Sequence, residues 1–161
     1  MSNPKNTSPK FPTVKGSNLQ RKTMTLPNDL EGDLNLLFVP FQRWQQSQVD
    51  SWIPFAITLE NDYPNLRYYE LPTMQSLNWL SQTFINQGMR AGIPDPMARE
   101  RTITLYLNKN EFKDALGIET ETTIHVFLVN RDGDVLWRSE GNYSREEAQA
   151  LSSVIKKKLE K

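Results

Sequence analysis

The chain reads Leu34-Asn-Leu-Leu-Phe-Val-Pro-Phe41 and, two residues later, Trp44-Gln45-Gln46-Ser47-Gln48. The first segment is short and apolar, which is typical of a strand buried at the centre of a sheet. A helical stripe follows it, with apolar residues at Val49, Trp52, Ile53, Ala56 and Leu59. Because Pro54 falls inside this stripe, we expect a kink or two short helices there. The pattern therefore predicts a buried strand that leads directly into a helix.

The order of the segments resembles that of a thioredoxin. The Trp-Cys-x-x-Cys motif of thioredoxins lines up with Trp44-Gln45-Gln46-Ser47-Gln48. Both sulfur positions are glutamine here, and the chain contains no cysteine. Thiol exchange needs a thiolate, which none of these side chains can supply. Thr122-Thr123 stands where a thioredoxin usually has a cis-proline. We therefore expect a binding protein on this scaffold rather than a thiol enzyme.

The composition is that of a soluble globular protein, with 37% hydrophobic and 24% charged residues. A chain of 161 residues fits one domain with a proper core. Its formal net charge of zero gives no long-range attraction to nucleic acid, so we expect no nucleic-acid partner. No apolar run reaches the length of a membrane helix, and no signal-peptide core follows Met1. Residues 1–10 are polar with two prolines and predict a flexible tail before a single domain at 11–161.

Further strands and helices are indicated on both sides of the central segment. Val14–Gln20 and Lys22–Pro27 predict a ribbon at the sheet edge, and four later segments predict strands, namely Leu66–Leu71, Thr102–Leu107, Thr123–Val129 and Val135–Trp137. Helices are predicted from Ser76, over Asn110–Leu116 and from Ser144. Together these elements predict an α/β fold, a thioredoxin-like three-layer sandwich with a mixed sheet, an N-terminal β-ribbon and a C-terminal helix.

Three local patterns fix where these elements turn. Gly117, followed by apolar Ile118, predicts a left-handed helix end. Asp132-Gly133 predicts a β-hairpin. Ser144-x-x-Glu147 predicts a capping box at the start of the last helix.

Candidate catalytic and metal-binding residues are scarce. His125 is the only histidine, and a metal site or a triad would need partners that the chain lacks, so we expect a structural histidine. We predict no catalytic residue, no cofactor and no metal. Trp52 and Trp79 fall on apolar stripes and are expected in the core, whereas Trp44 either packs over the helix start or anchors a partner.

Strand ends and helix starts meet at one edge of such a scaffold. There we expect Trp44, Gln45 and Gln48, with Thr122 and Thr123 beside them, to offer an indole and polar groups to a partner chain. Arg90, Arg99 and Arg101 lie in a segment rich in proline and methionine, which fits either an interface or a solvated connection. These eight residues form the predicted partner-binding set.

Several segments in order resemble the family of assembly factors for the membrane sector of mitochondrial ATP synthase. They are Phe11-Pro12 with Gly16 and Leu19, Leu26-Pro27, Asp50-Ser51-Trp52 with Pro54-Phe55, Arg90 with Ile93-Pro94, Ala115-Leu-Gly-Ile118 and Leu128–Gly133 through Trp137 to Gly141. The resemblance implies a peroxiredoxin-like fold, a chaperone function for a membrane subunit of the synthase, and no established catalytic site. The chain departs from the family at Leu136, where an arginine is expected, at Arg138-Ser-Glu140, and in having no visible transit peptide.

The resemblance leaves some properties open. A cytoplasmic protein and one of an organelle matrix or stroma both fit the sequence, as does a location at a membrane surface. The alternative function is an enzyme or small-molecule-binding protein of the same fold that uses thiol-free chemistry. The sequence predicts neither the identity of the client nor the oligomeric state.

Overall fold

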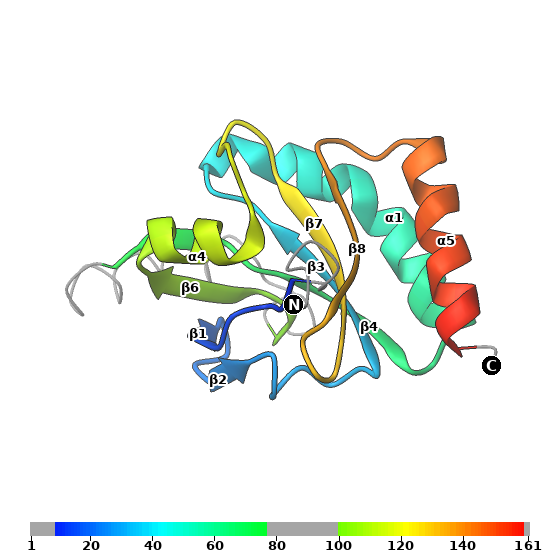
Figure 1. Ribbon diagram of the computed structural model, residues 1–161, viewed down its shortest axis with the longest axis horizontal. Coiled ribbons are helices and arrows are strands. Elements are labelled where there is room, and N and C mark those ends of the chain that lie inside the picture. The colour runs from blue at the N-terminus through cyan, green and yellow to red at the C-terminus, as the bar shows by residue number, and fades with distance from the viewer. Residues whose placement is uncertain (1–8, 77–99, 160–161) are drawn as a thin grey trace, which may run out of the picture.

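A computed structural model describes residues 9–76 and 100–159 of the chain, and Figure 1 shows how their helices and strands are arranged. The strands are β1 Val14–Asn18, β2 Thr23–Leu26, β3 Leu34–Val39, β4 Leu66–Glu70, β5 Thr73–Gln75, β6 Ile103–Leu107, β7 His125–Asn130 and β8 Val135–Glu140. Within the described residues the helices are α1 Gln46–Asp62, α4 Lys109–Leu116 and α5 Arg145–Leu159, and a 3-10 turn, η2 Arg43–Gln45, precedes α1.

The central strand β3 lies inside a sheet of order β4-β3-β7-β8. It pairs in parallel with β4 and antiparallel with β7, which makes the sheet mixed. All six of its residues are buried. Because successive side chains point to opposite faces, Leu36 and Phe38 pack into one core while Leu37 and Val39 pack into the other. The prediction of a buried central strand is confirmed.

One expectation about the sheet needs correction. We expected Thr102–Leu107 in the same sheet as β3, but β6 belongs to a second four-stranded sheet of order β2-β1-β6-β5. The two sheets meet between β4 and β5, where Leu71 N donates to Phe38 O and Leu105 N donates to Pro72 O, at 2.7 and 2.8 Å. Proline has no N–H and cannot continue a ladder on both sides. The chain therefore changes from one sheet to the other at Pro72.

Helix α1 forms without a break, so the alternative of two short helices around Pro54 is wrong. Pro54 is exposed, which lets water satisfy the carbonyl that loses its helical donor. The buried side of α1 carries Val49, Trp52, Ala56 and Leu59, as the apolar stripe predicts. Trp52 is fully buried, whereas Trp79 and the helix predicted from Ser76 lie outside the described residues.

The helices cover two faces of the β4-β3-β7-β8 sheet. Helices α1 and α5 pack on the face of Leu36 and Phe38, where α5 buries Leu151 and Ile155. On the other face α4 buries Phe112 and Leu116 in a core that it shares with the β1-β2 ribbon and β6. Figure 1 shows α5 beside α1 on one side and α4 with β1, β2 and β6 on the other. The predicted thioredoxin-like three-layer α/β fold is confirmed.

The local turn signals appear where the sequence places them. Gly117 ends α4 with φ 67°, and Ile118 N donates to Lys113 O, as in a Schellman ending. Gly133 has φ 87° in the turn between β7 and β8. Ser144 Oγ accepts from Glu147 N, but the Glu147 carboxylate accepts from Ser139 Oγ instead of completing a capping box. Strand β7 begins at His125 rather than at Thr123.

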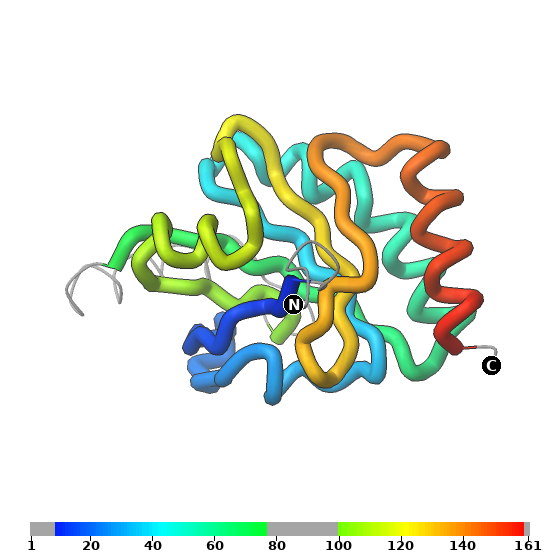
Figure 2. The backbone as a smooth tube through the Cα atoms, in the orientation of Figure 1, coloured from blue at the N-terminus to red at the C-terminus, as the bar shows by residue number. Residues whose placement is uncertain are grey.

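The first described residues lie against the β7-β8 turn. Pro9 O accepts from Val135 N at 3.0 Å, and Phe11 N donates to Gly133 O at 2.7 Å. Lys10 Nζ lies 3.4 Å from the Asp134 carboxylate. Figure 2 shows the N-terminal end of the described chain at the middle of the molecule and the C-terminal end beyond α5. The chain is thus hydrogen-bonded from Pro9 onward, two residues before the predicted start of the domain.

Candidate functional site

The start of α1 lies against the segment that precedes β7, as the scaffold requires. We call this region the Trp44 edge and define it by Trp44, Gln45, Gln48, Thr122 and Thr123. Trp44 stands in the 3-10 turn η2 and is 58% exposed, the most exposed of the large apolar side chains described. Its carbonyl accepts a hydrogen bond from Ser47 Oγ at 3.2 Å, which helps to fix the turn. An indole held on a rigid turn is suited to contact another molecule.

Gln45, at the first sulfur position of the motif, is fully buried. Its Oε1 accepts hydrogen bonds from Phe41 N at 2.7 Å and Gln42 N at 3.2 Å, and its Nε2 donates to Glu121 O at 2.5 Å. The amide therefore satisfies two backbone donors after β3 and one backbone acceptor before β7. These hydrogen bonds connect the two segments. Because the side chain is fully buried, it is not accessible to a partner.

Gln48, at the second sulfur position, also bonds to the segment before β7. Its Oε1 accepts from Thr123 Oγ1 at 3.2 Å and from Ile124 N at 3.0 Å. The side chain is half-buried, and among the described residues its Nε2 has no hydrogen-bond partner. The two glutamines that replace the thiols thus hold α1 and the pre-β7 segment in place, and Gln48 keeps one donor for an outside acceptor.

Thr122 is the exposed member of the threonine pair. Its N–H donates to Thr120 Oγ1 at 3.1 Å, and the two hydroxyl oxygens lie 2.8 Å apart. Thr123 is half-buried and donates to Gln48. The accessible groups of the Trp44 edge are therefore the Trp44 indole, the Gln48 amide nitrogen and the Thr122 hydroxyl.

A charged cluster below the edge was not foreseen from the sequence. The Glu121 carboxylate accepts from Lys109 Nζ at 2.9 Å and from Lys113 Nζ at 2.7 Å. Burial opposes the charge of this carboxylate, but the two lysine hydrogen bonds outweigh burial and lower its pKa. Lys109 and Lys113 stand one turn apart on α4, a spacing that indicates a shared partner. The cluster connects α4 to the segment before β7, to which Gln45 is also hydrogen-bonded.

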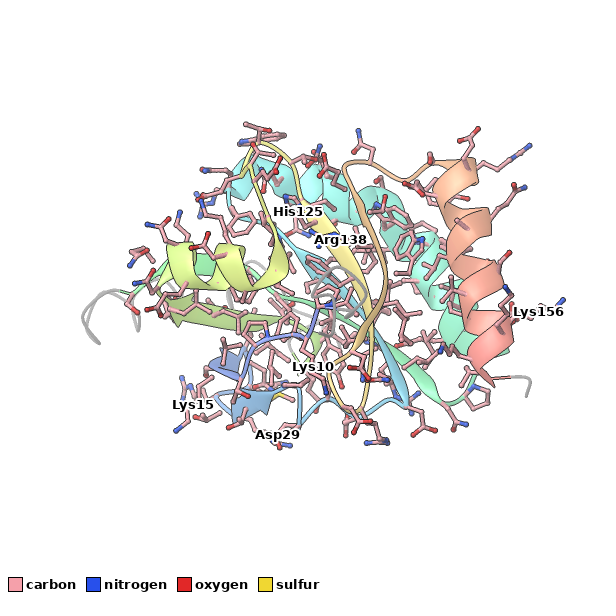
Figure 3. The ribbon with its side chains drawn as sticks, viewed as in Figure 1. Lys10, Lys15, Asp29, His125, Arg138 and Lys156 are labelled. Carbon is pink, nitrogen blue, oxygen red and sulfur yellow. The ribbon has the colours of Figure 1, made fainter. Side chains whose placement is uncertain are left out.

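His125 lies directly behind the same segment. It is 3% exposed, its Nε2 donates to Thr120 O at 2.9 Å, and its ring packs against Phe41 and Phe127. Burial lowers its pKa, against the opposing effects of the Thr120 hydrogen bond and of Glu140, whose Oε2 lies 3.8 Å from Nδ1. Figure 3 shows His125 and Arg138 on the neighbouring strands β7 and β8. These contacts agree with the prediction of a structural histidine.

The predicted arginines do not join the Trp44 edge within the described part of the chain. Arg101 forms a two-pronged ion pair with Glu60 and stacks over the Tyr68 ring, with its Cζ 4.3 Å from the ring centroid. Because Glu60 stands in the last turns of α1, this pair lies about 20 Å along the helix from its start. Arg90 and Arg99 lie outside the described residues. The residues that the structure brings together are Trp44, Gln45, Gln48, Thr122 and Thr123.

The side chains of the Trp44 edge carry one indole, two amides and two hydroxyls. The chain has no cysteine to act as a thiolate nucleophile. Within residues 9–76 and 100–159, no group of three histidine, aspartate or glutamate side chains is placed to hold a metal ion. In the same residues no helix is long and apolar enough to cross a membrane. The edge offers an exposed aromatic ring, one amide donor and one hydroxyl on a rigid support.

The fold and this site define a thioredoxin-like protein in which amides occupy the thiol positions. The particular family follows from the whole sequence, since the family model described as ATP10 protein matches residues 3–157. The chain belongs to this family, which comprises assembly factors of ATP synthase. The resemblance seen in the sequence is therefore confirmed. No curated protein sequence matches the chain.

Solved structures support the fold. BsSco, a member of the Sco family of cytochrome c oxidase assembly proteins, has a TM-score of 0.60 at 14% identity and covers 92% of each chain. The exposed lipoprotein thioredoxin Etrx1 of Streptococcus pneumoniae has a TM-score of 0.56 at 12% identity, covering 90% of this chain and 99% of its own. The thioredoxin domain of the thiol-disulfide oxidoreductase BVU-2223 of Bacteroides vulgatus has a TM-score of 0.51 at 14% identity, covering 92% and 96%. At these identities the likeness concerns the fold alone.

Proposed function

We propose that this protein is a non-catalytic assembly factor that binds a protein client at the Trp44 edge. Its membership of the ATP10 family supports an assembly role. The observation that carries the proposal is the 58% exposed Trp44 on the rigid turn where a redox relative would hold its reactive thiol. An exposed indole on a fixed support loses little conformational entropy on binding, and tryptophan is among the residues that dominate interface energies.

The polar groups around Trp44 suggest how the client lies. Gln48 Nε2 can donate and Thr122 Oγ1 can donate or accept, which suits the carbonyl and N–H groups of an extended backbone. We propose that an extended client segment crosses the edge and places an apolar side chain against the Trp44 indole. Because Gln45 is fully buried, it supports this surface and does not contact the client.

The family points to ATP synthase as the source of the client. We propose a newly made membrane subunit of the synthase, which exposes apolar segments before it is assembled. The protein would then act in an aqueous compartment next to the membrane that holds the synthase, at the membrane surface or in the adjoining cytoplasm, matrix or stroma. The partner-binding set predicted from the sequence is reduced in this proposal to Trp44, Gln48 and Thr122, and Thr123 supports Gln48.

The test is capture of the client from native membranes with tagged protein, followed by mass spectrometry. The wild-type chain should recover membrane subunits of ATP synthase, and Trp44→Ala should recover far less. The matched control is Ile57→Ala, which truncates a 46% exposed apolar side chain on α1. If both variants retain the client, or if soluble metabolic enzymes alone are recovered, the proposed function is wrong. A thiol-free enzyme would instead turn over a small molecule, and Trp44→Ala would reduce that turnover.

A further inference from the structure

A groove lies between α1 and α5. Its volume is about 610 Å³, within the range of ligand-binding pockets in proteins. Three aromatic side chains, Phe55, Tyr63 and Tyr143, line its apolar part. We call it the α1–α5 groove; Figure 1 shows the two helices that border it.

The aromatic wall of the α1–α5 groove is held in place by its neighbours. The Tyr143 ring lies 5.5 Å from the Trp52 ring and 5.7 Å from the Phe55 ring, measured between centroids. Tyr143 N donates to Ser51 Oγ at 3.0 Å, which fixes the backbone before α5 on α1. Tyr143 nevertheless remains 40% exposed. The apolar wall is thus preformed and open to a ligand.

The other wall of the groove consists of one face of α5. It contributes Arg145, Gln149 and Lys156 at helical spacing, with two serines between them. Among the described residues, none that lines the groove is acidic. Among the residues that the structure describes, neither Arg145 nor Lys156 has an ion-pair or hydrogen-bond partner. Figure 3 shows Lys156 projecting outward from α5. The groove therefore combines an aromatic wall with two cations that have no partner in the part of the chain that the structure describes.

We infer that the α1–α5 groove binds a peptide segment in which two carboxylates flank an apolar side chain. Arg145 and Lys156 stand about three turns apart on α5, or about 16 Å along the helix. A single phosphate or lipid headgroup is too small to contact both cations at once. An extended peptide rises about 3.3 Å per residue, so two acidic residues about five positions apart match this spacing.

Each part of such a peptide meets a complementary group. The Arg145 guanidinium can hold one carboxylate with two parallel hydrogen bonds, and the Lys156 ammonium attracts the other as a point charge. The apolar side chain between them packs on Phe55, Tyr63 and Tyr143, while Gln149 bonds to the peptide backbone. This site goes beyond the proposed function, because it shares no residue with the Trp44 edge and does not depend on it.

Binding of short labelled peptides to the full chain tests the inference by fluorescence anisotropy. The probe is Asp-Ser-Leu-Ser-Ser-Asp, with one comparison peptide that carries asparagine in place of both acids and another that has the two acids adjacent. The spaced acidic peptide should bind most tightly, and its affinity should fall as salt rises. Arg145→Gln and Lys156→Gln should each weaken its binding about threefold, as expected for solvent-exposed ion pairs.

Lys157→Gln provides the matched control, since Lys157 is an exposed neighbour on α5 that does not line the groove. It should leave the affinity unchanged, and the urea midpoints of all three variants should equal that of the wild type. Equal binding of the three peptides would overturn the inference, as would equal losses for Lys156→Gln and Lys157→Gln. Binding to phosphatidylglycerol vesicles that depends on Arg145 and Lys156, without binding of the peptide, would overturn it in favour of a lipid site.

Discussion

The Trp44 edge and the α1–α5 groove differ in whether their polar side chains have hydrogen-bond partners within the described residues. At the edge, the Gln45 amide makes three hydrogen bonds to backbone groups and is fully buried, while an aromatic ring is left exposed. In the groove the aromatic rings form the wall, and Arg145 and Lys156 have no partner among the described residues. Substitutions at the edge should therefore separate into effects on stability and effects on binding, whereas substitutions of the groove cations should affect binding alone.

The largest expected effect concerns Gln45, which supports the edge. Gln45→Ala would leave Phe41 N, Gln42 N and Glu121 O without their partner in a buried place. We expect a loss of about 3 kcal/mol in the free energy of unfolding, measured by urea denaturation. Arg145→Gln, tested alongside, should change this free energy by no more than about 0.5 kcal/mol. Equal losses for the two variants would remove the distinction between the regions.

The next effect concerns Trp44, which should act in binding rather than in folding. Trp44→Ala should weaken client binding by about 2 kcal/mol if the indole is a central anchor. Because the side chain is 58% exposed, the free energy of unfolding should change by no more than about 0.5 kcal/mol. Titration calorimetry with the captured client measures the first quantity, and urea denaturation measures the second. A less stable variant with intact binding would show that Trp44 serves packing.

Gln48 should show a smaller and mixed effect. Its Oε1 accepts from Thr123 and Ile124, and its Nε2 has no hydrogen-bond partner within residues 9–76 and 100–159. Gln48→Ala should lower the free energy of unfolding by about 1 kcal/mol, less than Gln45→Ala because Gln48 is only half-buried. Gln48→Glu keeps the acceptor but removes the donor, so it should lose client binding more than stability. If Gln48→Glu binds the client as tightly as the wild type, the amide nitrogen is not part of the interface.

The smallest expected effect is a change in the free energy of unfolding with pH, because each titrating group contributes only over a limited pH range. Burial lowers the pKa of His125 below 6.5, so the unfolded chain takes up this proton before the folded one. The stabilisation from the neutral ring is complete above pH 6.5 and is lost as the pH falls through the folded-state pKa. Burial opposes the charge of Glu121 as well, but the hydrogen bonds from Lys109 and Lys113 prevail and lower its pKa. The stabilisation from this carboxylate is therefore lost only below pH 4.5.

The variant His125→Gln separates the contribution of His125 to the pH dependence of stability from the contributions of the groups around it. Glu140 and Arg138 on β8 and the Thr120 carbonyl face the His125 ring and remain in His125→Gln. The urea midpoint of the wild type should decline as the pH is lowered below 6.5, and His125→Gln should decline less over the same range. Parallel declines in the two proteins would show that His125 does not titrate in this window.

Local signals in the sequence predicted much of the fold. The left-handed end of α4 at Gly117 and the hairpin at Gly133 need only neighbouring residues and a positive φ, which glycine supplies. The sheet assignment of β6 could not be predicted in the same way, because it depends on the change of sheet at Pro72 and on pairing with β1 and β5. Periodicity shows that a segment is a strand but not which strand lies beside it.

The site shows the same limit. Alignment with the thioredoxin motif placed the five residues of the Trp44 edge next to one another. In the structure, hydrogen bonds from Gln45 and to Gln48 join the start of α1 to the segment before β7. The alignment could not show that Gln45 is buried, because its partner Glu121 is 76 positions away. For the same reason Arg101 was grouped with the interface, although it pairs with Glu60, 41 positions away. Long-range partners decide which polar atoms remain free.

The most direct measurement of the central claim is crosslinking from position 44. Trp44 is replaced by p-benzoylphenylalanine in the full chain, and Ile57 is replaced in a parallel sample; both proteins are irradiated with native membranes. We expect position 44 to crosslink to a membrane subunit of ATP synthase and position 57 to form no such crosslink. Crosslinks from position 57 alone, or from neither position while the client is still captured, would contradict this expectation.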